Sequence, residues 1–260
     1  MKIFLFLILI NTLIFSQELS YSKQFLKDSL LAIVINDTIN PGEKFHAYYL
    51  MHRDTMLTQA EDMELFWDVW KDLKEASDTL LVKDSAVNKW VFPVEGYGTG
   101  DIGGGGTGYI TGEYDYFKKG AKGFIHPAHD IFVRDRNQDN LDDRTGKPVY
   151  ILSVNDGIVI TVNTGWTPQS TLKGGNYIYI YDPYMDAMVY YAHNDSVFVK
   201  PGDLVKRGDK IATMGRTGLN AYPKRSPTHL HFMTLKIENG YPRPYNPLPE
   251  LKDSEFRMPE

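Results

Sequence analysis

The spacing of apolar residues changes near residue 90 of the 260-residue chain. Before that point, the stretch 61–79 places apolar side chains on one face at the period of a helix: Leu65, Phe66, Val69, Trp70 and Leu73. We therefore predict a helix over 61–79 that packs on the main domain; a helix that binds a partner protein is the alternative. A second helix is expected over 22–34, and the run "KFHAYYLM" (44–51) is predicted to be a strand. Residues 17–89 are thus interpreted as a small N-terminal region of mixed α/β structure.

From Trp90 onward, short β-rich runs alternate with Gly, Pro, Asn and Asp. Strands are predicted within 147–164, 175–182, 187–194 and 229–237. The run "VKPGDLVKRGDKIATMG" (199–215) contains Pro-Gly and Gly-Asp pairs, which indicate tight reversals. Residues 90–247 are therefore predicted to form a mainly β domain, an antiparallel sandwich or barrel-like fold, and 248–260 a C-terminal tail.

The N-terminus has the pattern of a secretory signal peptide. Lys2 precedes an apolar run from Ile3 to Phe15, and the small residue Ser16 follows. A membrane anchor is the alternative, but a span needs about 20 apolar residues and this run is shorter. We expect cleavage after Ser16, no stable membrane span afterwards, and a secreted or periplasmic protein.

Composition narrows the candidate chemistry. The formal charge is −5 and no long basic run is present, so nothing favours nucleic-acid binding. The chain has no cysteine, which excludes disulfides and thiolate zinc sites. Any metal site must therefore be built from His, Asp or Glu.

Two of the seven histidines stand one residue apart in "THLHF". In a strand, residues i and i+2 share a face, so His229 and His231 are expected side by side while Leu230 and Phe232 enter a core. Such a pair by itself is weak evidence for a metal site, because it is often just two polar residues on the exposed face of a strand.

A second pattern lies upstream in "GFIHPAHDIF", where His126 and Asp130 are four residues apart. Two imidazoles and a carboxylate are a common ligand set of catalytic zinc. His126, Asp130 and one histidine of the HLH pair would complete it. His129, between the first two, is expected at the surface rather than as a partner of a ligand.

Four blocks in this order, "HPAHDI", "YYAHND", "VKPGDLVKRGDKIATMGRTG" and "HLHF", resemble the lysostaphin/LytM-type zinc endopeptidases, which cut peptidoglycan peptides. The resemblance covers roughly residues 90 to 247 and includes "VFPVEGYG" at its start. It implies the duplicated hybrid motif fold, zinc as cofactor and peptidoglycan peptides as substrate in the bacterial cell envelope.

Carried over to this chain, the resemblance implies zinc ligands at His126, Asp130 and His231, and catalytic histidines at His193 and His229. It leaves open which of the two catalytic histidines acts as base. The chain departs from the family at Asn194 and Met233, where Leu and Glu are usual, and by the extra stretch "LNAYPKRSP" (219–227). These departures affect the expected substrate preference rather than the ligands.

A non-catalytic member of the same family, which binds peptidoglycan or activates a partner hydrolase, is the alternative function. Such a protein is expected to lack one or more of the five positions, and all five are filled here. We expect a monomer. The bond that is cut, and whether residues 17–89 block the groove, stay open.

The acidic stretch "RDRNQDNLDDRTG" resembles the start of a calcium loop. Its oxygen donors would be the backbone carbonyl of Leu141 and the side chains of Asp135, Asn137, Asp139 and Asp143. The pattern departs at Asn140, where Gly is usual although Asn can adopt the left-handed conformation, and at Gly146, where Glu is usual. A weak Ca²⁺ site and a plain acidic loop are both left open.

Overall fold

The computed structural model describes residues 21–80, 89–118 and 125–259. The predicted signal peptide, 1–16, lies outside the described residues. A helix over 21–34 is followed by α2 (Pro41–Arg53) and α3 (Gln59–Leu80), and α4 (Leu248–Asp253) lies near the C-terminus. The strands are β1 (Ala128–Phe132), β2 (Tyr150–Leu152), β3 (Gly157–Asn163), β4 (Asn176–Asp182), β5 (Ala187–Val197), β6 (Leu204–Val205), β7 (Lys210–Met214), β8 (His229–Glu238) and β9 (Tyr241–Tyr245).

These strands pair in the order β1-β8-β5-β4-β3-β6, and every ladder is antiparallel. β9 pairs with β8, while β7 pairs with both β2 and β5. β5 pairs with β4 and β8, and its C-terminal end pairs with β7. The pairing with β7 shifts register between Asn194 and Val197, which bends the strand towards this third partner. The sheet therefore curls on itself, which confirms the mainly β, antiparallel fold class.

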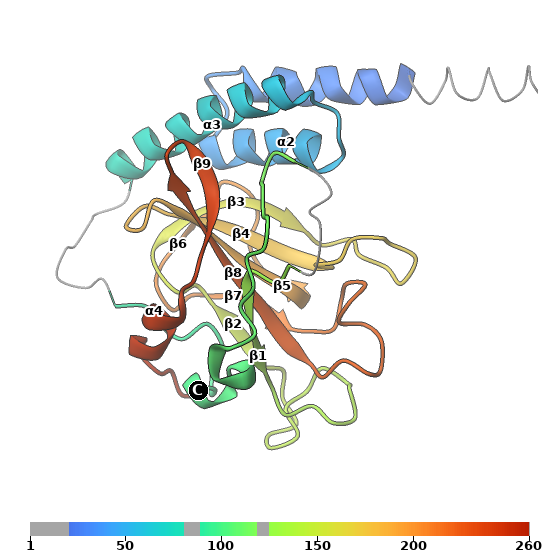
Figure 1. Cartoon of the computed structure of the whole chain (residues 1–260), viewed down its shortest axis with the longest axis vertical. Helices are drawn as coiled ribbons and strands as arrows, with labels where there is room; N and C mark the ends of the chain where they lie inside the picture. The colour runs from blue at the N-terminus through green and yellow to red at the C-terminus, as the bar shows by residue number, and fades with distance from the viewer. Residues whose placement is uncertain (1–20, 81–88, 119–124, 260) are drawn as a thin grey trace, which may run out of the picture.

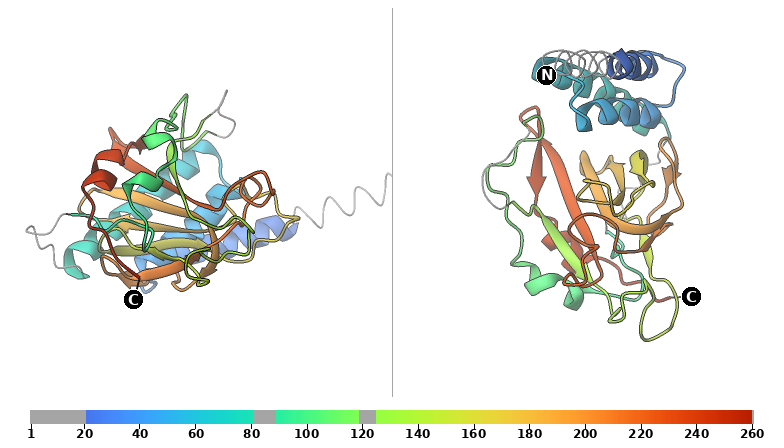
Figure 2. Two further views of the ribbon diagram at one scale, coloured as in Figure 1. Left: turned by 90° about the horizontal axis from the view of Figure 1, so that it is seen from below. Right: turned by 90° about the vertical axis from the view of Figure 1, so that its right-hand side faces the viewer.

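The two faces of the sheet are covered by two separate cores. One lies inside the curled sheet and includes Phe92, Ile151, Tyr191, Leu230 and Phe232. The other lies between the sheet and the N-terminal helices, which form a layer over β3 and β4 (Figure 1). The two further views in Figure 2 show the same helical layer on one side of the sheet.

Strand β4 shows the effect of this arrangement most clearly. Ile178 and Ile180 face the inner core, whereas Tyr177, Tyr179 and Tyr181 face the helices. All seven residues of β4 are buried. The tyrosine face of β4 is therefore covered by the helical layer.

The strand predicted over 44–51 is wrong, because these residues lie in α2. Asn40 caps the helix by accepting a hydrogen bond from the Gly42 N–H (2.8 Å), and Pro41 occupies the first turn. Phe45, Tyr48 and Met51 then share a buried face at helical spacing. The Asn-Pro start was the signal of a helix that this prediction missed.

The other two helices are confirmed, over 21–34 and in α3. Trp70 of α3 is 1% exposed, and its ring lies edge-on to Tyr181 of β4 at 4.8 Å. Among the described residues, no helix is both long enough and apolar enough to span a bilayer. The boundary at residue 90 stays a prediction, although the helices and the sheet share one core.

Candidate metal centre

Pairing between β1 and β8 places the predicted ligands together. The two strands are antiparallel, with Asp130 directly opposite His231. Directly opposite residues of an antiparallel pair point to the same face of the sheet. Leu230 and Phe232, which alternate with the two histidines, are fully buried as predicted.

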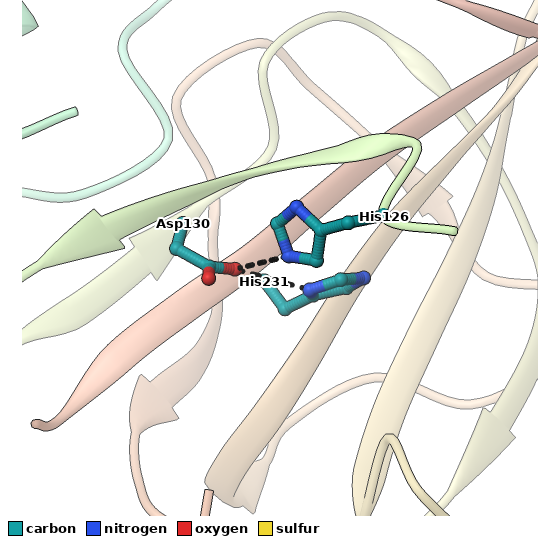
Figure 3. A group of neighbouring side chains, drawn as sticks. All are labelled: His126, Asp130 and His231. Carbon is teal, nitrogen blue, oxygen red and sulfur yellow. Dashed lines mark hydrogen bonds and ion pairs between the residues drawn. The ribbon is translucent and has the colours of Figure 1, made fainter. Parts of the chain in front are cut away.

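His126 lies just before β1, where its backbone pairs with Ile110 through two hydrogen bonds of 2.8 Å. Its Nε2 atom is 3.2 Å from Oδ1 of Asp130, and Nδ1 of His231 is 3.1 Å from the same oxygen. One ligand atom from each side chain can be chosen so that all three lie within 4.8 Å of one another. Figure 3 shows the three side chains converging from the loop, β1 and β8.

The protonation of this cluster is set by hydrogen bonds. Burial alone would raise the pKa of Asp130, but hydrogen bonds with His126 and His231 outweigh it and hold the pKa well below its usual range. The hydrogen bond with Asp130 also raises the pKa of His126, against the effect of burial. The carboxyl of Asp130 is therefore ionised and available as a ligand.

The donor set fits zinc. His126 Nδ1 lies 3.0 Å from the carbonyl oxygen of Gly108, which can only accept, so Nδ1 carries the proton. The lone pair of Nε2 can then point at Asp130 Oδ1, and two such acceptors repel unless a proton or a cation lies between them. A ligating histidine that donates its other ring N–H to a carbonyl is a common feature of zinc sites. His126, Asp130 and His231 together fit a zinc ion.

His193, on β5, is held in an unusual conformation. Its φ of 72° lies in the left-handed region, which residues other than glycine rarely adopt. Its Nδ1 donates to the carbonyl of Thr217 (2.8 Å), and a Cβ on the next residue, Gly218, would come within 2.9 Å of that nitrogen. Burial, followed by the neighbouring imidazoles of His231 and His229, lowers the pKa of His193 to about 3. The ring is therefore neutral, with Nε2 unprotonated.

His229, on β8, has the same arrangement. Its Nδ1 donates to the carbonyl of Pro227 (2.8 Å), and its Nε2 lies 3.7 Å from Asp130 Oδ1. Burial lowers the pKa of His229, while the carboxylate of Asp130 opposes the effect. The rings of His193 and His229 are 4.9 Å apart. The two predicted catalytic histidines thus lie next to the predicted ligands, each with a free Nε2.

A cavity of about 340 Å³ opens over this cluster and is lined by all five predicted residues. Tyr190 and Lys173 also line it, and sequence reasoning did not single them out. Tyr190 precedes the "AH" of β5, and its ring lies edge-on to His231 at 6.1 Å. The sequence also did not predict the backbone carbonyls of Gly108, Thr217 and Pro227, which hold the Nδ1 atoms of the histidines. Every residue has such a carbonyl, so residue type does not indicate which ones are used.

The expectation for His129 is wrong. This side chain is 2% exposed, and its Nε2 lies 2.8 Å from Oδ1 of Asn246. Its ring stacks on Tyr109 at 5.4 Å. Because neighbouring residues of a strand point to opposite faces, His129 packs on the side of β1 away from Asp130.

The structure does not support the calcium site. Asp135 is 5% exposed, and its carboxylate accepts the backbone N–H groups of Asp139 (3.0 Å) and Asn140 (3.1 Å) and the hydroxyl of Thr228 (2.7 Å). Asn140 has a φ of 68°, the left-handed conformation expected in place of glycine. The oxygens of Asp135 are occupied by backbone amides of the loop and by the hydroxyl of Thr228.

The remaining acidic side chains of the loop are engaged in the same way. Asp139 accepts the N–H of Leu141 (3.0 Å), and Asp143 accepts that of Arg136 (3.2 Å). Asn137 donates its amide to Asp139 (2.7 Å). Within 21–80, 89–118 and 125–259, the only group of three or more His, Cys, Asp or Glu side chains close enough to hold a metal is the His126, Asp130 and His231 cluster. The loop is stabilised by its own amides, which favours the plain acidic loop.

Comparison with known proteins gives a family match for part of the chain. Residues 140–247 match the family described as Peptidase family M23. Peptidoglycan DD-endopeptidase ShyB of Vibrio cholerae serotype O1 (strain ATCC 39315 / El Tor Inaba N16961) is 42% identical over 93 residues, which are 35% of this chain and 18% of ShyB. The chain therefore spans less than a fifth of the length of that relative.

Solved structures of similar sequence include the catalytic domain of lysostaphin from Staphylococcus simulans, 28% identical, covering 56% of this chain and 90% of that one, with a TM-score of 0.37. A zinc containing peptidase from Vibrio cholerae is also 28% identical, covering 60% of this chain and 38% of that one, with a TM-score of 0.38.

Residues 140–247 thus match peptidase family M23, and this match agrees with the predicted resemblance to lysostaphin/LytM-type enzymes. The matched range includes His193, His229 and His231. His126 and Asp130 precede it, so their assignment rests on the geometry of the cluster.

Proposed function

We propose that this protein is a zinc-dependent endopeptidase that hydrolyses peptide bonds in bacterial peptidoglycan. The observation that carries the proposal is the convergence of three ligand atoms within 4.8 Å beside two buried histidines. The family match and the similarity to ShyB, a peptidoglycan DD-endopeptidase, support the substrate class.

His126, Asp130 and His231 would hold the ion. When bound, zinc supplies Lewis acidity, which activates water and polarises the scissile carbonyl. Asp130 contributes the negative charge of the ligand set, and the Gly108 carbonyl keeps the lone pair of His126 Nε2 turned inward. These residues therefore fix the place where peptide and water meet.

His193 and His229 would handle protons and developing charge. Their Nδ1 atoms are committed to the Thr217 and Pro227 carbonyls, so proton exchange takes place at Nε2. A neutral imidazole with a free Nε2 can take a proton from the attacking water and later return it to the leaving amine. Once protonated, the same nitrogen can donate a hydrogen bond to the tetrahedral oxyanion. The division of these roles between the two rings stays open.

We further propose that the protein acts outside the cytoplasm, either secreted or periplasmic, because its proposed substrate lies in the cell envelope. The predicted signal peptide agrees with this. The monomeric state and cleavage after Ser16 stay predictions.

The proposal is tested by digesting purified peptidoglycan with the zinc-loaded protein, with and without a chelator, and identifying the fragments by mass spectrometry. We expect new amino and carboxyl termini within the wall peptides, lost on chelation and restored by added zinc. Unchanged peptidoglycan after treatment with zinc-loaded protein would contradict the proposal.

A further inference from the structure

A second cavity of about 600 Å³ lies beside the metal centre and is not used in the proposed hydrolysis. Thr217 borders this cavity, and its carbonyl accepts the hydrogen bond from His193 (2.8 Å). Three loops form the walls, namely 137–140, 166–168 and 216–224. Its size is in the range of ligand pockets, about 300–1,000 Å³.

Two aromatic rings face each other across two of these loops. Trp166 comes from the loop between β3 and β4, and Tyr222 from the extra stretch 219–227. Their centroids are 5.4 Å apart and their planes are inclined by 55°. Trp166 is partly exposed, and Tyr222 is 54% exposed. The rings thus offer an accessible apolar surface in a cavity that polar side chains also line.

The loops that carry these rings are held in place by hydrogen bonds. Arg216, 7% exposed, donates to the carbonyls of Pro223 (3.1 Å) and Ser226 (2.7 Å). Gln138 donates to the carbonyl of Lys224 (2.9 Å). The backbone N–H of Trp166 donates to the side-chain oxygen of Asn176 (3.1 Å). A cavity that is already formed loses little entropy when it binds a ligand.

The polar groups of the lining suit a ligand rich in hydroxyls. Asn137, Gln138 and Asn140 supply amide groups, and Lys224 supplies a cation. Asn140 Oδ1 and Trp166 Nε1 are buried and have no hydrogen-bond partner within the described parts of the chain.

We propose that this cavity binds a pyranose ring of a glycan. A saccharide can place its C–H face on the aromatic rings and its hydroxyls on the amides. The inference rests on the proposed function, since a glycan bound here would continue into the peptide held at the metal centre. The extra stretch 219–227 thereby gains a role as a wall of the glycan site.

The test is a calorimetric titration of the full chain with a peptide-free, β-1,4-linked tetramer of N-acetylglucosamine. We expect saturable binding by the wild type and about tenfold weaker binding by Tyr222→Ala, since an aromatic contact is worth about 0.5–1.5 kcal/mol. Tyr222→Phe, which keeps the ring, and Tyr241→Ala, on β9 away from the cavity, should bind as the wild type does. Absence of saturable binding by the wild type, or equal binding by Tyr222→Ala, would overturn the proposal.

A second measurement does not depend on a variant. Amide chemical shifts of the wild type should move on glycan addition at 137–140, 166–168 and 216–224, and shifts confined to other regions would overturn the assignment. A free wall peptide, titrated in parallel, should not lose affinity in Tyr222→Ala; if the peptide loses it and the glycan does not, the cavity is a peptide site and the proposal is wrong. Glycan binding without peptidoglycan hydrolysis would refute the endopeptidase function alone, and hydrolysis without glycan binding would refute the glycan site alone.

Discussion

At the scale of single residues, two histidines separated by one residue have different surroundings. His231 faces Asp130 at 3.1 Å, whereas His229 keeps Nε2 at 3.7 Å from the same oxygen and turns Nδ1 to the Pro227 carbonyl. The strand places both rings on one face, and their hydrogen bonds support the proposal that His231 is the ligand. Removing either ring should therefore have a different consequence.

We predict that His231→Ala loses both zinc and hydrolytic activity, because two ligands cannot replace three. His229→Ala should retain zinc while its turnover falls by about 10²–10⁴-fold, the usual contribution of a general acid or base. Metal analysis and peptide hydrolysis of each purified variant measure the two effects separately.

His46→Gln provides the control, because His46 contacts Thr161 in the helical layer and should leave zinc content and turnover as they are. Full zinc occupancy in His231→Ala would show that the ligand assignment is wrong.

At the scale of elements, α3 is part of the main core. Trp70 packs against Tyr181 of β4 and stacks on Phe66 at 5.4 Å. A helix whose apolar face is shared with the sheet cannot leave without exposing both surfaces. The helical layer and the sheet should therefore unfold together.

Trp70→Ala should lower the free energy of unfolding of the whole molecule by about 3–5 kcal/mol, the cost of a large cavity in a packed core. Urea unfolding followed by circular dichroism measures this. Lys71→Ala, whose side chain is 75% exposed and 3.8 Å from Glu75, should change stability by no more than about 1 kcal/mol. A separate early transition that reports only the helices would contradict the shared core.

At the scale of the whole molecule, a buried carboxyl gives stability a pH dependence. Burial raises the pKa of Asp182 to about 6, although the N–H groups of Met185 and Tyr184 oppose the effect. The folded state binds the proton of the Asp182 carboxyl more tightly than the unfolded state does. The stability that this proton contributes to the folded state is therefore fully present below pH 3.8 and is lost as the pH rises through about 6.

We predict that Asp182→Asn removes this loss, because an amide does not ionise. Between pH 3.5, just below the ordinary pKa of 3.8, and pH 7, about one unit above the raised pKa, the variant should gain stability relative to the wild type by on the order of 3 kcal/mol at most. Urea denaturation at several pH values gives the difference. A difference between the two proteins that stays constant with pH would rule out titration of Asp182.

The sequence by itself determined the β texture after residue 90, the helix in α3 and the candidate ligands, since hydrophobic period and residue type are local properties. The strand predicted over 44–51 was wrong because Asn40 and Pro41 begin a helix there, Asn40 as its cap and Pro41 in its first turn.

Only the tertiary structure decided that Asp130 faces His231, because strand register follows from packing along the whole sheet. It also decided that Asp135 caps its own loop and that Trp166 meets Tyr222 beside the metal centre. These contacts join residues far apart in the chain or depend on backbone groups that every residue carries. The amino-acid pattern alone therefore could not reveal them.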